Sequence, residues 1–182
     1  MTLDRSAAER LLTDLATQLD VAGIAVTIHL VGGVAVMLTA RPDRAATVDV
    51  DSWINSGPDD DIRAKVMSVA AEIARRNPGI SADWLNENAR MFIPDNVGGS
   101  DDEWDPYLEI GQVKIVLAPA PVLLAMKLRA GRGRRDLPDV QALIEACGLS
   151  TITEVTDLYE HYYPHDEIAP RAIAWLAANL PA

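Results

Sequence analysis

The sequence predicts an α+β fold, in which a mixed β-sheet flanked by helices is followed by a helical C-terminal part. Three observations lead to this prediction. Apolar residues recur at helical spacing at the start of the chain, β-branched apolar runs follow, and helical patterns fill the C-terminal part. Strands grouped before a run of helices are typical of α+β proteins. We expect a core over residues 1–118 and a helical part over 119–182 that packs on it, as a second unit or within one domain.

The elements of the first half alternate between helix and strand. Four leucines at helical spacing predict a helix over residues 3–20. The β-branched run IAVTIHLV predicts a buried strand over 24–31 that leads into the pair Gly32-Gly33. The apolar letters VAVML that follow predict the first turns of a short helix.

A second strand is predicted over residues 47–54, which read TVDVDSWI. Because side chains on a strand alternate between its two faces, Asp49 and Asp51 share one face. Val48 and Val50 are expected on the other face.

The remaining chain is marked by glycine and proline between periodic segments. Residues 81–94 indicate a short turn and strand, and an acidic loop follows over 95–105. Two strands over 107–110 and 113–117 are predicted to form a hairpin. Apolar periodicity, with flanking Pro or Gly, predicts five helices, over residues 59–76, 119–130, 136–146, 152–162 and 167–180.

Composition limits the classes of function. The chain has 182 residues, 49% hydrophobic and 24% charged, which excludes a disordered or fibrous protein. Its net charge of −11 argues against general coating of nucleic acid or a membrane surface, so any RNA contact must be local. The single cysteine, Cys147, excludes a disulfide framework, and neither a signal peptide nor a membrane span is apparent. We therefore expect a cytoplasmic protein.

Asp49 and Asp51 are the strongest local signal of a functional site. Two carboxylates on one side of a strand repel each other, and a divalent cation with oxygen ligands, such as Mg²⁺, offsets that repulsion. The alternative is that both face solvent on an edge strand, where charges prevent pairing with other chains.

Two further features suit phosphate. Backbone N–H groups at the Gly32-Gly33 turn could hold phosphate oxygens, although a glycine pair after a strand can also be only a tight turn. Five of the 16 basic residues fall within nine positions: Lys127, Arg129, Arg132, Arg134 and Arg135. In an acidic chain this segment suits a triphosphate or a nucleic-acid backbone, or it is a solvated helix end.

The segments LVGGVAVML, RAATVDVD, DWLN, LLAMKLRA and RRDLPDV resemble, in this order, nucleotidyltransferase-fold proteins related to the AbiEii toxins. The resemblance covers roughly residues 30–147. It implies that Gly32 and Gly33 contact nucleotide phosphates and that Asp49 and Asp51 bind Mg²⁺ or Mn²⁺. Such proteins usually have an arginine where Arg44 stands, which we assign to nucleotide binding.

The same resemblance implies roles for the basic segment and the aspartates after it. Lys127 would hold the triphosphate, with Arg129 as a second nucleotide-binding residue. Asp136 would assist or orient the acceptor. The further candidates in this region are Asp139, Arg132 and Arg135.

The sequence departs from the family at two places. Many of the toxins have Ser where this chain has Gly33, so a role for that hydroxyl is not carried over. A third strand carboxylate, present in several nucleotidyltransferases, is not evident. Glu109 is the strand candidate, and its alternative is an exposed strand position.

The resemblance implies a nucleotidyltransferase that uses ATP or another NTP with Mg²⁺. It would be the toxin of a toxin–antitoxin system, with tRNA as acceptor and an antitoxin protein as partner. A protein or small-molecule hydroxyl is the alternative acceptor. The competing hypothesis is a non-catalytic scaffold of the same fold that binds a nucleotide or a partner protein.

Overall fold

The computed structural model describes residues 2–55, 60–98 and 103–181. The sheet contains five strands, β1 (Val26–Val31), β2 (Val50–Asn55), β3 (Leu85–Asn86), β4 (Asp105–Ile110) and β5 (Val113–Leu117). Within the described residues the α-helices are α1 (Arg5–Val21), α2 (Gly32–Thr39), α3 (Asp60–Arg76), α4 (Ala120–Ala130), α5 (Leu137–Ala146), α6 (Ile152–Tyr162) and α7 (Pro170–Asn179). Helices and a mixed sheet in this order confirm the α+β prediction.

The sheet is mixed, with strand order β3-β2-β1-β5-β4. The central strand β1 runs antiparallel to β2 and parallel to β5. The predicted hairpin is confirmed, because β4 and β5 pair antiparallel around Gly111. Strand β3 extends the sheet parallel to β2, which places Asn86 opposite Asp51. The edge at β3 therefore lies beside the acidic pair.

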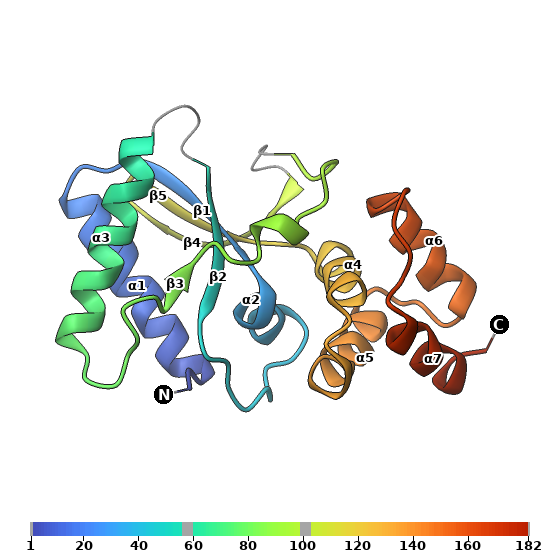
Figure 1. The fold of residues 1–182 in the computed structure, drawn as a ribbon. Helices are drawn as coiled ribbons and strands as arrows, with labels where there is room; N and C mark the ends of the chain where they lie inside the picture. Colours follow the sequence, from blue (N-terminus) through green and yellow to red (C-terminus); the bar gives the residue numbers. More distant parts are fainter. Residues whose placement is uncertain (1, 56–59, 99–102, 182) are drawn as a thin grey trace.

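Helices cover both faces of the sheet (Figure 1). Helices α1 and α3 pack against each other on one side. Asp4 begins α1 because its carboxylate accepts a hydrogen bond from the backbone N–H of Ala7 at 2.8 Å. The leucine stripe of α1 is completely buried at Leu11, Leu12, Leu15 and Leu19. Helix α2 lies on the other side of the sheet, between the strands and the C-terminal helices.

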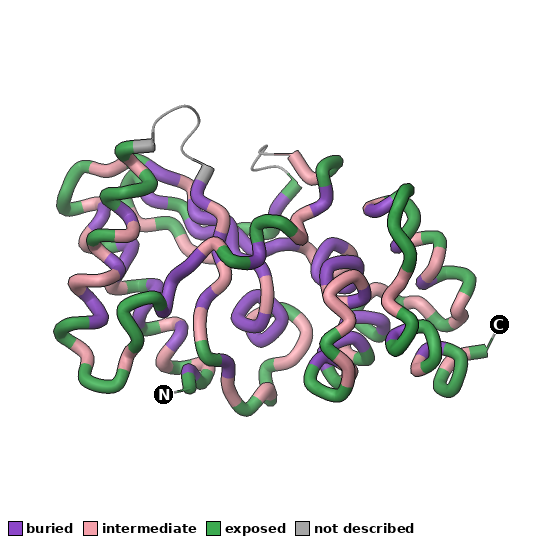
Figure 2. Tube along the Cα trace, in the orientation of Figure 1, coloured by how far each residue is buried: buried purple, intermediate pink, exposed green. Residues whose placement is uncertain are grey.

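The C-terminal helices lie at one side of the sheet, with α4 between α2 and the pair α5 and α6 (Figure 1). Buried residues continue from the sheet through α2 into α4, whereas α7 is largely exposed (Figure 2). A 3₁₀ turn, η3 (Gly133–Arg135), joins α4 to α5. The division predicted at residue 118 falls between β5 and α4, and it stays a prediction. No helix in the described ranges has the length and apolar character needed to cross a membrane.

The start of the second strand differs from the prediction. Residues 47–54 were expected to form one strand, but β2 begins at Val50. Thr47 instead pairs with Leu3 through two backbone hydrogen bonds of 2.6 and 2.8 Å. Val48, expected on the same face as Val50, lies before β2 and is 52% exposed, whereas Val50 is buried. A pairing with the N-terminal segment, which alternation cannot reveal, bends the chain before β2.

Candidate active site

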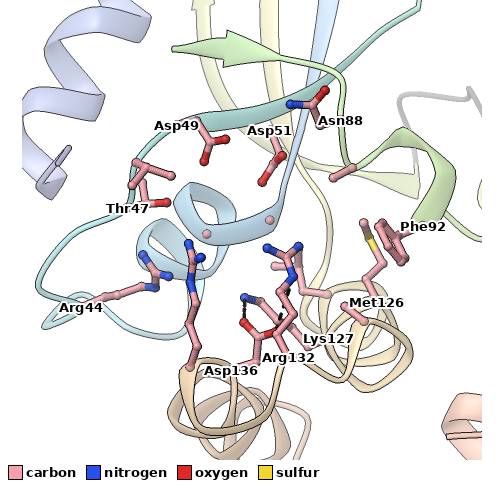
Figure 3. A pocket seen from close by; sticks show the side chains of 17 residues that line it. Arg44, Thr47, Asp49, Asp51, Asn88, Phe92, Met126, Lys127, Arg132 and Asp136 are labelled. Carbon is pink, nitrogen blue, oxygen red and sulfur yellow. Dashed lines mark hydrogen bonds and ion pairs between the residues drawn. The ribbon is translucent and has the colours of Figure 1, made fainter. Parts of the chain in front are cut away.

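A pocket of about 270 Å³ lies between the start of α2, the beginning of β2 and the facing end of α4 (Figure 3). It brings together residues that are up to about a hundred positions apart in the sequence. Those predicted from the sequence that line it are Gly32, Gly33, Arg44, Asp49, Asp51, Lys127, Arg132, Arg135 and Asp136. The pocket therefore joins the glycine turn, the acidic pair and the basic segment in one cavity.

The two glycines are needed because other walls of the pocket approach them closely. Gly32 has a φ of 69°, and a Cβ there would collide with the carboxylate of Asp51. A Cβ on Gly33 would lie 2.8 Å from Thr47 Oγ1. A side chain at this position would therefore require Thr47 to move. Since no side chain caps the start of α2, its N-terminal end faces the pocket with its backbone donors available.

Asp49 and Asp51 both point into the pocket (Figure 3). Burial, together with the negative charge of Asp49, raises the pKa of Asp51 from 3.8 to about 6. Asn86 Nδ2 donates a hydrogen bond to Asp49 Oδ2 at 3.1 Å. The acidic pair therefore does not sit on a solvated edge, and a bound cation would relieve its repulsion.

The acidic pair has the chemistry to hold a divalent ion. Mg²⁺ and Mn²⁺ prefer carboxylate oxygens, and Mg²⁺ usually keeps several waters and takes one or two protein carboxylates. Across the described ranges, no group of three or more His, Cys, Asp or Glu side chains that could hold a metal ion comes together. The residue beside Asp49 on the next strand is an amide, Asn86. The donors thus fit an ion held by two carboxylates and completed by substrate oxygens and water.

A buried ion network supports the basic wall of the pocket. Lys127 Nζ donates to Asp136 Oδ1 and to Asp139 Oδ2, both at 2.9 Å. Asp139 also accepts from Arg41 Nη1 at 2.9 Å and from Arg44 Nε at 3.2 Å. Burial opposes ionisation of Asp139, but these positive charges and hydrogen bonds hold its pKa below the usual value. Asp139 is 1% exposed and does not line the pocket, so it supports the cations from behind.

Asp136 differs from Asp139 because it faces the pocket. It is 3% exposed, and its Oδ1 binds Lys127. Its Oδ2 receives no hydrogen bond from the described residues, and Arg132 Nε lies 3.8 Å away. A buried carboxylate oxygen without a donor can accept a hydrogen bond from a ligand.

Three of the predicted site residues do not line the pocket: Asp139, which lies behind its basic wall, and also Arg129 and Glu109. Arg129 follows Lys127 by two positions, so the two side chains leave the helix about 200° apart. It pairs with Asp166 at 2.7 Å and lies 4.6 Å from the ring centroid of Tyr163. Glu109 is exposed on β4, and β1 and β5 separate that strand from β2 by roughly 14 Å. Neither Arg129 nor Glu109 therefore shares a cavity with the acidic pair.

The pocket also contains residues that sequence reasoning did not identify. Thr47, Asn88, Phe92 and Met126 line it, and Asn86 orients Asp49. The letters DWLNEN contain both asparagines, but no spacing connects them with Asp49. Their role depends on the pairing of β3 with β2, which is a tertiary feature.

Comparison of the chain with family models, with curated proteins and with solved structures finds no match in any of the three. The glycine turn, the acidic pair and the basic segment that line the pocket occur in this order along the sequence.

Replacing Asp51 by asparagine is expected to stabilise the metal-free protein at neutral pH. Because the folded state binds the proton of Asp51 more tightly than the unfolded state, stability falls as the pH rises from about 4 to about 6. The amide removes this cost, which is about 1 to 2 kcal/mol once solvent screening is included. Thermal unfolding at pH 7.5 should show a Tm higher by about 4 °C.

The difference should shrink at pH 4, where Asp51 is protonated in wild type. The exposed Asp95 provides the control, because Asp95→Asn should leave the Tm unchanged at both pH values. A lower Tm for Asp51→Asn at pH 7.5 would show that the burial of Asp51 and its repulsion by Asp49 do not destabilise the folded protein.

Proposed function

We propose that the protein transfers a nucleoside monophosphate from an NTP to an acceptor hydroxyl, with Mg²⁺ or Mn²⁺ bound by Asp49 and Asp51. One observation carries this proposal: a single pocket sets the acidic pair opposite a wall of basic side chains. A metal-bound triphosphate matches both sides, because its oxygens bind the metal and accept hydrogen bonds from cations. A ligand with only one of these properties would leave one wall unmatched.

We place the triphosphate against the glycine turn, within reach of both Arg44 and Lys127. The start of α2 supplies backbone N–H groups at Gly32 and Gly33. Arg44 lies beside Gly33, whereas Lys127 points into the pocket from α4, and Asp139 holds both side chains in place. Preorganised donors of this kind stabilise charge on the transferring phosphoryl group without reorganising during the reaction.

The reaction exchanges one bond to phosphorus for another. The acceptor hydroxyl oxygen forms a bond to the α-phosphorus, and the bond from that phosphorus to the bridging oxygen of the pyrophosphate group breaks. The hydroxyl proton passes to Asp136 Oδ2, which is buried and lacks a hydrogen-bond donor among the described residues. A divalent ion on Asp49 and Asp51 supplies charge neutralisation at the phosphate oxygens. Pyrophosphate leaves with the negative charge that Lys127 and the arginines offset.

We further propose an RNA acceptor, tRNA, and a role as the toxin partner of an antitoxin protein. The support for RNA is local. Arg132, Arg134 and Arg135 are exposed, and the first and last of them line the pocket, in a chain with a net charge of −11. A short basic rim can contact a few phosphates even where the rest of the surface repels nucleic acid.

Incubation of the purified protein with each α-labelled NTP, Mg²⁺ and total tRNA tests the proposal. We expect label on the tRNA and stoichiometric release of pyrophosphate, both abolished by chelation of the metal. Parallel reactions with cell protein and with small hydroxyl compounds test the other acceptors.

A non-catalytic nucleotide-binding scaffold is the second candidate, favoured by the amide Asn86 beside the acidic pair. Metal-dependent NTP binding without pyrophosphate release in any of these reactions would support it. Absence of NTP binding as well would refute both candidates.

A further inference from the structure

The pocket has two chemically different ends. Arg44 and Thr47 lie at one end, and Phe92 and Met126 lie side by side at the other, with Asp49 and Asp51 between them (Figure 3). Gly33 lies beside Arg44 and Thr47. The apolar lining of the pocket also includes Ala89, Leu123 and Ala130. Phosphates need the charged end, so the apolar end must suit another part of the same ligand.

Phe92, the single phenylalanine of the chain, is half-buried and belongs to a 3₁₀ turn, η1 (Arg90–Phe92). Its backbone carbonyl accepts a hydrogen bond from the hydroxyl of Tyr163. Arg129 Nη1 donates to the carbonyl of the preceding Met91 at 3.5 Å. Since Arg129 also stacks on the ring of Tyr163, these two residues hold η1 against the C-terminal helices. They are positioning residues for the ring of Phe92.

We propose that Phe92 and Met126 form the binding site for the nucleobase of the NTP, an inference that rests on the function proposed above. A nucleobase is a flat aromatic group joined through a sugar to the charged phosphates. A nucleotide therefore has an apolar end and a charged end, as the pocket does. Any nucleobase can stack on an aromatic side chain, because every base has a π-face. The thioether of methionine also packs well against an aromatic ring. The acidic pair between the two ends then faces the phosphates nearest the sugar.

Binding measurements with two ligands separate this site from the phosphate site. We expect Phe92→Ala to weaken Mg²⁺-dependent ATP binding by about tenfold, as loss of one base-stacking contact does. Binding of inorganic tripolyphosphate with Mg²⁺ should not change, because it has no base. The neighbouring Met91 is 74% exposed and does not line the pocket, so Met91→Ala should change neither affinity.

Two more variants test the ring and its support. Phe92→Leu keeps an apolar side chain but removes the π-face, so it should weaken ATP binding in the same direction while preserving the Tm. Tyr163→Phe removes the hydroxyl that binds the carbonyl of Phe92, and we expect about threefold weaker ATP binding with tripolyphosphate unaffected.

The outcomes are distinct. Unchanged ATP affinity in Phe92→Ala and Phe92→Leu, or an equal loss for ATP and tripolyphosphate, would overturn the base site while leaving the proposed function intact. Failure of the wild-type protein to bind either ligand would overturn the proposed function and the base site together. A loss confined to ATP would support both.

Discussion

Replacing Asp49 by asparagine is expected to lower the rate of nucleotidyl transfer by about 1000-fold, equivalent to about 4 kcal/mol of barrier. The substitution removes a negative charge from the acidic pair that we propose as the metal site. It preserves size and leaves an oxygen that can accept the hydrogen bond from Asn86, so the fold should be retained. Initial rates of pyrophosphate release, compared at matched Tm, measure the effect.

Glu109→Gln is the matched control for this experiment. Glu109 is an acidic strand residue that sequence reasoning proposed, but the structure places it on β4 at the far edge of the sheet, opposite Lys114 on β5. Its substitution should leave the rate within about twofold of wild type, since the side chain is exposed and outside the pocket. Comparable losses from both variants would show that the catalytic carboxylates are assigned incorrectly.

Replacing Asp139 by asparagine is expected to destabilise the fold by about 3 to 5 kcal/mol, because it leaves buried cations without their shared anion. Arg41, Arg44 and Lys127 all bind this one carboxylate, which is 1% exposed. Urea unfolding at pH 7 should show the loss as a lower midpoint with an unchanged slope. Release of Arg44 and Lys127 should also weaken tripolyphosphate binding.

The pH dependence follows from the lowered pKa of Asp139. A carboxyl with a lowered folded-state pKa adds stability above its unfolded-state pKa, and that stability disappears as the pH falls below about 4. The difference between wild type and Asp139→Asn should therefore decrease on acidification. Asp136→Asn is the control, because Asp136 hydrogen-bonds only Lys127 among the described basic residues and should cost less stability. Equal stability of wild type and Asp139→Asn would show that the ion network around Asp139 does not stabilise the fold.

Local periodicity in the sequence was sufficient to predict most of the secondary-structure elements. The helix predicted over residues 152–162 is confirmed at both ends, and the hairpin around Gly111 is confirmed as well. These elements depend on neighbouring residues, such as the capping box of Thr151 and Glu154 at the start of α6. Residues 99–102, within the acidic loop predicted over 95–105, lie outside the described residues.

The candidate site could be predicted from sequence where its residues belong to ordered motifs. Ordered motifs predict Asp49, Asp51 and Lys127 as site residues, and the structure brings them to one pocket. Arg129 was selected with them because it is close to Lys127 in sequence, but helical geometry directs it to Tyr163 instead. Proximity along a helix is therefore a poor guide to which side chains share a pocket.

The sequence by itself determined the α+β class, the order of the elements and the types of charged group that could bind phosphate and metal. These properties depend on patterns within a few residues. Only the tertiary structure decided that Asn86 orients Asp49, that Asp139 lies behind the pocket and that Phe92 lies beside Met126 at its apolar end. The physical reason is that each of these relations joins distant segments through strand pairing or helix packing, and burial then fixes which groups must be paired.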